Sequence, residues 1–217
     1  MISGNDPRRR WRLALLLLTP ATGWCAGLEI PSLLAHLTRP APSSIAFVEA
    51  HFSPLLVRPL VVSGQLEYLG PGTLARTVTE PYRERSEIRG DTATVERPGE
   101  PPRRFSLERA PQMQALVASF AGLLSGNSAA LERTFRLDLH GDAQHWLLGL
   151  VPLNPEVRRS IRSITVSGAG SEPRCLTTYE ANDDTTVLLL GSAAKLPSSQ
   201  ATPDRAWLDA QCRGGSR

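Results

Sequence analysis

The sequence lacks the short motifs by which many enzymes are identified. It contains no Gly-x-Ser-x-Gly nucleophile elbow, no Walker phosphate-binding loop and no dinucleotide-binding glycine fingerprint. It also has no Cys-x-x-Cys pair, which leaves thiol redox catalysis without support. His140 and His145 flank Asp142, but they lie on opposite arms of a predicted tight hairpin, which favours exposed turn residues over a metal site. We therefore expect a protein that is not an enzyme and has no cofactor.

The chain also has little net charge once its first 26 residues are set aside. The whole sequence holds 24 basic and 21 acidic residues. Four arginines and one aspartate fall within residues 1–26, so that residues 27–217 contain 20 of each sign. A balance of this kind gives no indication of a nucleic-acid partner.

The N-terminus carries an apolar run, but one too short to cross a bilayer, which needs about 20 apolar residues. Residues 8–12 read Arg-Arg-Arg-Trp-Arg, and the apolar run 13–18 follows them. This order predicts a cleaved signal peptide over 1–26 and export to the periplasm, rather than an amphipathic core helix. A lipid-anchored start at Cys25 is disfavoured because Trp24, not a small residue, precedes it.

Only three cysteines are present, and Cys25 lies in the predicted signal peptide. Cys175 and Cys212 remain as an even pair in an oxidising compartment. We expect a disulfide between them, with two free thiols as the alternative.

Short strands joined by turn residues dominate the rest of the chain. Apolar and polar residues alternate through most of these segments, and turns such as Gly70-Pro71-Gly72 and Gly90-Asp91 separate them. The segment 44–52 fits a strand or a helix, and we favour a strand. The predicted strands are 44–52, 61–69, 73–79, 82–90, 92–97, 103–108, 133–140, 145–153, 163–170, 174–181 and 185–191.

Helices are few and grouped. The spacing of apolar residues predicts helices over 29–38 and 111–124, a short helical turn at 128–132, and a small helix near Trp207. The sum is one α+β domain over 27–217, with about ten antiparallel strands, helices packed on one face, and a tail from about 195.

Two blocks of the chain resemble the LolA-like branch of the outer-membrane lipoprotein carrier family. The first reads PLVVSGQLEYLGPGTLARTVTEPYRERSEIRGD from Pro59, and the second reads LLSGNSAALERTFRLDLHG followed by HWLLGLVPLNPEVRRSIRSITVSG. The residues that carry the likeness are Pro59, Leu60, Gly64, Leu66, Tyr68, Leu74, Pro81, Gly90, Asp91, Gly126, Leu131, Phe135, Trp146, Leu148, Leu150, Pro152, Ile164 and Gly168.

This resemblance implies an incomplete (half) β-barrel whose concave face is covered by helices. It implies a monomeric periplasmic carrier that takes acyl chains from an inner-membrane donor complex to an outer-membrane acceptor. The side chains expected to line the apolar cavity are Leu66, Tyr68, Leu74, Val78, Phe105, Phe120, Leu124, Phe135, Trp146 and Leu148. The alternative for each is an ordinary core residue. The helix 111–124 is then either a movable lid or a static packing helix.

The chain departs from the family pattern at the first hairpin. Lipoprotein carriers proper place a basic residue just before the proline there, whereas this sequence has Gly70 before Pro71. A related acylated product, such as an aryl-polyene lipid, is therefore an alternative cargo to a lipoprotein. A periplasmic scaffold or adaptor with a filled half-barrel is the alternative function.

Overall fold

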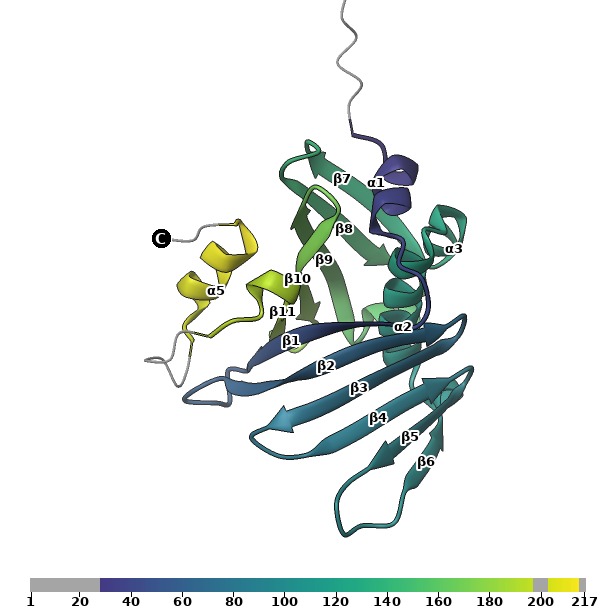
Figure 1. The fold of residues 1–217 in the computed structure, drawn as a ribbon, viewed down its shortest axis with the longest axis vertical. Helices are drawn as coiled ribbons and strands as arrows, with labels where there is room; N and C mark the ends of the chain where they lie inside the picture. The colour runs from purple at the N-terminus through teal and green to yellow at the C-terminus, as the bar shows by residue number, and fades with distance from the viewer. Residues whose placement is uncertain (1–27, 197–202, 215–217) are drawn as a thin grey trace, which may run out of the picture.

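An antiparallel sheet forms the framework of the fold (Figure 1). The computed structural model describes residues 28–196 and 203–214, and in this part the sheet has eleven strands in the order β6-β5-β4-β3-β2-β1-β11-β10-β9-β8-β7. The predicted signal peptide and part of the predicted tail lie outside the described residues. The strands are β1 (Ser43–Phe52), β2 (Leu60–Gly70), β3 (Thr73–Glu80), β4 (Glu84–Arg89), β5 (Thr92–Glu96), β6 (Arg103–Ser106), β7 (Phe135–Gly141), β8 (Trp146–Pro152), β9 (Ile161–Ala169), β10 (Glu172–Glu180) and β11 (Thr185–Leu190).

Two meanders build this sheet. Strands β1–β6 pair in chain order, strands β7–β11 pair in chain order, and the pairing of β1 with β11 joins the two sets. The edges β6 and β7 do not pair with each other, so the curved sheet stays open. This confirms the predicted α+β half-barrel, and each of the eleven predicted strand segments has its counterpart in the sheet.

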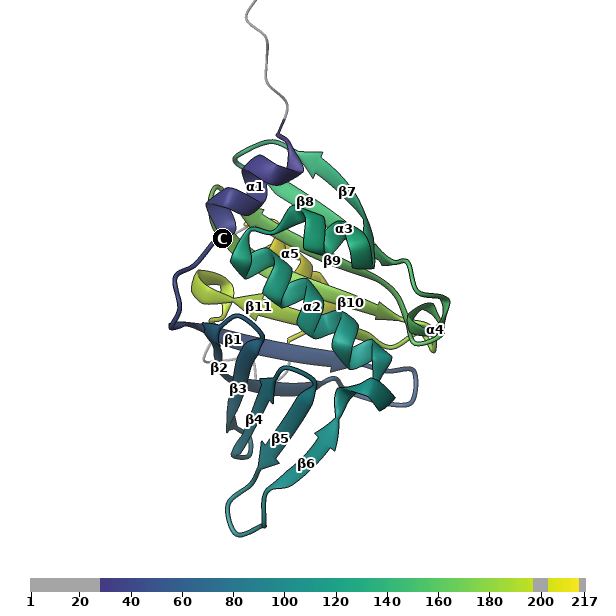
Figure 2. The ribbon, with the colours of Figure 1, turned by 90° about the vertical axis from the view of Figure 1, so that its right-hand side faces the viewer.

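Helices lie on both sides of the sheet. The helices α1 (Ile30–Leu37), α2 (Pro111–Ser125) and α3 (Ser128–Thr134) cover its concave face, and α5 (Arg205–Cys212) lies on the convex face (Figures 1 and 2). The short α4 (Pro155–Arg158) connects β8 to β9. Figure 2 shows α2 running from the end of β6 toward α1, across the opening between the two meanders.

The central strand β11 is apolar on both of its faces. Leu188 and Leu190 pack into the concave core, while Val187 and Leu189 pack into the convex one. Because helices cover both faces here, neither set of alternating side chains can be polar. The strand TTVLLL therefore lacks the alternation seen in β3 and β4.

Several element boundaries differ from the sequence prediction by about two residues, among them those of α3 and β4. Helix α3 runs to Thr134, two residues into the strand predicted from 133, because the Asn127 side chain caps a full two-turn helix. Strand β4 begins at Glu84 rather than at Tyr82, because Pro81 and its neighbours form the turn.

The buried face of α2 consists mainly of small residues. Its buried residues are the small Ala115, Ser119 and Gly122, together with Leu123. A Cβ added to Gly122 would lie 2.4 Å from Cγ of Leu131 on α3. Small residues are therefore needed where α2 meets its neighbouring helix, and the large side chains lie on less covered positions.

A disulfide fastens α5 to the convex face. Cys175 on β10 and Cys212 on α5 form the bond, which confirms the predicted pairing. Leu208 is fully buried in the same cluster, beside Val48 and Leu189. The C-terminal helix therefore belongs to the folded domain.

Glu172 links the β9–β10 hairpin to the turn after β11, and this contact is expected to be sensitive to acid. The hydroxyl and the backbone N–H of Ser192 bond its carboxylate and hold its pKa below the ordinary value. A depressed folded pKa adds stability above about pH 4.3 that is lost as the pH falls through the folded pKa. Glu172→Gln should therefore flatten the fall of the unfolding midpoint below about pH 4.

The matched control for this prediction is Glu132→Gln at an exposed position of α3. Thermal unfolding followed by circular dichroism from neutral to acid pH measures both variants. A Glu172→Gln protein whose midpoint falls as steeply as that of the wild type would contradict the prediction.

Candidate functional site

The concave face of strands β2–β6 carries a row of apolar side chains that crosses all five strands. Tyr68 lies opposite Leu74, Leu74 opposite Ile88, Ile88 opposite Ala93, and Ala93 opposite Phe105. Directly paired residues of antiparallel strands point to the same face. Four strand spacings of about 4.8 Å make this Tyr68–Phe105 row about 19 Å long, comparable to an extended fatty acyl chain.

The cover over this row is uneven, and the one exposed member lies on the edge strand β6. Tyr68 is 8% exposed and Ala93 4%, whereas Phe105 on the edge strand is 45% exposed. Leu74 and Ile88 are partly buried. The Tyr68–Phe105 row is therefore an apolar track that the protein itself covers only in part.

Helix α2 has a second apolar surface that is incompletely covered. None of its 15 residues is charged. Apart from the buried Leu123, its large apolar side chains are only partly buried or exposed; they are Met113, Leu116, Val117, Phe120 and Leu124. A surface helix usually has a charged outer face, so α2 is suited to contact a further apolar group.

The ten predicted cavity residues separate into two sets. Five are buried in the structure: Tyr68, Val78, Phe135, Trp146 and Leu148. The other five are partly buried or exposed: Leu66, Leu74, Phe105, Phe120 and Leu124. Only the second set has surface left for a ligand in this conformation.

The Trp146 side chain packs inside the protein and is not accessible to a ligand. Its indole N–H donates to the carbonyl of Gly170 at 2.9 Å. A Cβ added to Gly168 would lie 2.2 Å from the indole ring. The ring therefore packs directly on the backbone of β9, and Gly168 is required for that contact.

One ion pair lies within the concave face. Arg76 on β3 bonds Glu49 on β1 at 3.0 Å, and its guanidinium lies 4.9 Å from the centre of the Phe47 ring. Both charged side chains are about one quarter exposed. Arg76 shares the concave face with Leu74 and Val78, because alternate residues of a strand point to the same side, and it supplies a charge beside the apolar track.

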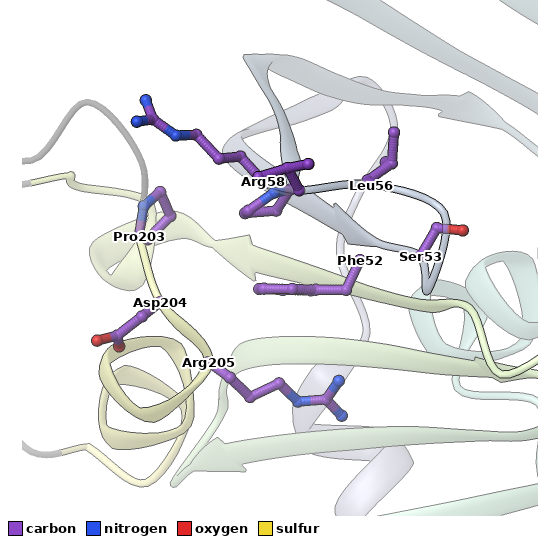
Figure 3. A pocket seen from close by; sticks show the side chains of 9 residues that line it. Phe52, Ser53, Leu56, Arg58, Pro203, Asp204 and Arg205 are labelled. Carbon is purple, nitrogen blue, oxygen red and sulfur yellow. The ribbon is translucent and has the colours of Figure 1, made fainter.

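The two hollows mapped on the described residues lie outside the concave core. One of about 510 Å³ lies between the β1–β2 loop and the start of α5, where Phe52, Leu56, Arg58 and Arg205 line it (Figure 3). The other, of about 340 Å³, lies over β1 and β2 beside Leu196. Under α1–α3 the concave core is packed, with Leu34, Leu148 and Ile164 fully buried.

Sequence reasoning did not select Ile88 and Ala93, which complete the Tyr68–Phe105 row. In β4, Ile88 alternates with Arg85, Glu87 and Arg89, which point to the opposite face of the strand. Those outward residues do pair, since Arg85 bonds Glu67 on β2 and Thr77 on β3. The Glu67 hydrogen bond also raises the pKa of Arg85, so the convex face of β2–β4 is a charged surface.

Within residues 28–196 and 203–214, no group of three potential ligands could hold a metal ion. The carboxylate of Asp142 instead accepts the backbone N–H groups of Gln144 and His145, which lower its pKa and fix the β7–β8 hairpin. None of the helices in this part is long and apolar enough to cross a membrane.

Several solved structures are similar to this chain at low sequence identity. The LolA superfamily protein NE2245 of Nitrosomonas europaea is 13% identical, with 82% of this chain and 95% of that chain covered and a TM-score of 0.44. A putative outer membrane lipoprotein-sorting protein domain of Vibrio parahaemolyticus is 10% identical, with 86% and 98% covered and a TM-score of 0.42. In the MucA/MucB complex of Pseudomonas aeruginosa, the matching chain is 12% identical, with 84% and 62% covered and a TM-score of 0.36.

No curated protein sequence matches the chain significantly. The sequence profile of the family described as outer membrane lipoprotein carrier protein LolA-like, in contrast, matches residues 22–215. This span includes every strand and helix described above, and the chain therefore belongs to the LolA-like family.

Proposed function

We propose that the protein is a monomeric, non-catalytic periplasmic carrier that binds acyl chains of a lipoprotein or a related lipid, such as an aryl polyene. In this proposal residues 1–26 are the cleaved signal peptide, and 27–217 form the single carrier domain. The carrier receives its cargo from an inner-membrane donor complex and delivers it to an outer-membrane acceptor.

The observation that carries the proposal is the match between two incompletely covered apolar surfaces. Leu74, Ile88 and Phe105 of the Tyr68–Phe105 row are only partly covered. Helix α2 has no charged residue, and its large apolar side chains other than Leu123 are partly buried or exposed. Each methylene moved from water into such a surface gains about 0.8 kcal/mol. An acyl chain between the row and α2 would thus bury its own apolar surface together with that of the row and of α2.

Helix α2 is suited to move because its two ends are held in different ways. Its C-terminus ends at Gly126, whose positive φ of 67° a side chain would disfavour, and a Cβ there would meet Thr38 after α1. Its N-terminus follows the short turn at Leu107–Arg109, directly after the edge strand β6. A shift of α2 about its anchored C-terminus would open the row for loading, and its return would cover the cargo.

The Arg76–Glu49 pair gives the proposed cargo an orientation. In β3 the apolar Leu74 belongs to the row, while Arg76 lies two residues nearer the end where β3 turns into β4. An acyl chain along the row would place its polar end toward this ion pair. Charged groups of the cargo then meet a charged side chain rather than the apolar track.

A scaffold or adaptor with a filled half-barrel is the second candidate, and one observation favours it. The core beneath α1–α3 is packed, with Leu34, Leu148 and Ile164 fully buried. An adaptor of this kind would bind a protein partner and carry no lipid.

Lipid extraction separates the two functions. The full chain is expressed with export, purified from the periplasm, and its organic extract is examined by mass spectrometry. The carrier predicts acyl-containing molecules in the extract and at least about tenfold weaker binding of a fluorescent fatty acid by the variant Leu74→Ser/Phe105→Ser, since two apolar contacts are lost.

Leu147→Ser is the matched control because Leu147 is 42% exposed on β8 but belongs to the opposite face from the buried Trp146 and Leu148. It should bind the fatty acid as the wild type does. An extract that stays empty in repeated preparations, together with no fatty-acid binding by the wild type, would support the adaptor instead.

A further inference from the structure

The β1–β2 loop is the most exposed apolar segment among the described residues. Leu55 is 92% exposed and Val57 is 101% exposed, while Leu56 and Leu60 in the same segment are 38% and 59% exposed. Single exposed apolar residues are common on protein surfaces, but four within six positions are not. The structure gives this loop no apolar partner for Leu55 or Val57, so an external partner is indicated.

Three arginines lie in this loop or at the same end of the sheet. Arg58 lies within it, Arg205 begins α5 across the hollow, and Arg83 lies in the β3–β4 turn at the same end of the sheet. Arg58 and Arg83 have no carboxylate partner in the described part of the chain, and Arg205 lies 5.5 Å from the centre of the Phe52 ring. Figure 3 shows Arg58 and Arg205 on either side of Phe52. The one carboxylate at the hollow, Asp204, is engaged as the N-cap of α5.

The shape of the loop distinguishes between partners. A protein partner would need a preformed pocket for each protruding side chain, whereas a bilayer accepts protruding apolar side chains anywhere on its surface. Unpaired arginines beside them match the negative headgroups of anionic lipids. We propose that the β1–β2 loop, through Leu55 and Val57 with Arg58, Arg83 and Arg205, docks the protein on an anionic bilayer surface.

This inference goes beyond the proposed carrier function and does not rest on it. The docking loop and the Tyr68–Phe105 row use different residues, and empty vesicles contain no lipoprotein cargo. Vesicle sedimentation measures docking, and lipid extraction with fatty-acid binding measures carriage. The two experiments therefore distinguish a protein that docks without carrying lipid from one that carries lipid without docking.

Vesicle sedimentation tests the docking loop. The exported full chain, with its N-terminus established by intact mass, is mixed with vesicles containing phosphatidylglycerol or with vesicles of phosphatidylcholine alone. The wild type should sediment with the anionic vesicles, and Leu55→Ser/Val57→Ser should bind them at least about tenfold more weakly. Arg58→Glu should also weaken binding, with a smaller dependence on salt than the wild type.

Leu69→Ser is the matched control, since Leu69 is 37% exposed at the opposite end of β2. It should bind anionic vesicles as the wild type does, and circular dichroism establishes that all variants are folded. The proposal is overturned if the wild type does not sediment with anionic vesicles, or if the double variant sediments equally well. It is also overturned if the double variant instead converts a dimer to a monomer in light scattering, because the loop would then bind a second copy.

Discussion

Removal of the Cys175–Cys212 disulfide is expected to lower the free energy of unfolding by about 3–4 kcal/mol. The two cysteines are 37 residues apart in the sequence, and a loop of that size loses considerable entropy in the unfolded chain when it is closed. The variant Cys175→Ala/Cys212→Ala tests this by chemical denaturation. Alanine is chosen because Cys175 is 1% exposed, and a serine hydroxyl there would be buried.

The same variant should lose the docking of α5 before the sheet unfolds. Leu208 packs into the convex core, and few other contacts hold the helix, among them the bond from Arg174 to the carbonyl of Gln211 at 3.4 Å. Limited proteolysis should therefore cut α5 in the variant and in reduced wild type, but not in the oxidised protein. Equal denaturation midpoints for the oxidised wild type and the variant would show that α5 contributes no stability through the bond.

The strands could be predicted from the sequence because each is short, alternating and bounded by turn residues. In β3, for example, Leu74 and Val78 share one face with Arg76, and the structure places all three on the concave side. Consecutive hairpins then fix the order within each meander. The fold class follows from these local signals together with the family resemblance.

The pairing of β1 with β11 has no local signal. Phe47 lies opposite Leu190 although 143 positions separate them in the sequence, and only the apolar character of both faces of β11 indicates a central strand. The resemblance to a half-barrel implied closure of this kind. Without it, the two meanders could have formed separate sheets.

The exposure of individual side chains in the site could not be predicted from the sequence either. Leu74 and Leu148 have the same residue type and the same alternating context, yet Leu74 is only partly buried and Leu148 is fully buried. The difference depends on which strands α1–α3 cover, and that is a property of the assembled layers. The buried face of α2 is a similar case, because small residues are buried there only through the close approach of α3.

Substitution of Leu148 and of Leu74 should therefore have different effects on stability and on cargo binding. Leu148→Ala should lower the free energy of unfolding by about 2–5 kcal/mol, because a fully buried side chain leaves a cavity among Phe135, Ile164 and their neighbours. Leu74→Ala should cost about 1 kcal/mol or less, since its surface is already partly solvated.

Binding should show the reverse order. The folded Leu148→Ala protein should keep the fatty-acid affinity of the wild type, whereas Leu74→Ala should lose several-fold in affinity because it removes apolar surface from the Tyr68–Phe105 row. Urea denaturation and titration with a fluorescent fatty acid measure the two quantities on the same preparations. If instead Leu148→Ala weakens binding while Leu74→Ala does not, the acyl chain must enter the packed core beneath α1–α3, and α2 would have to move much further from the sheet than the row alone requires.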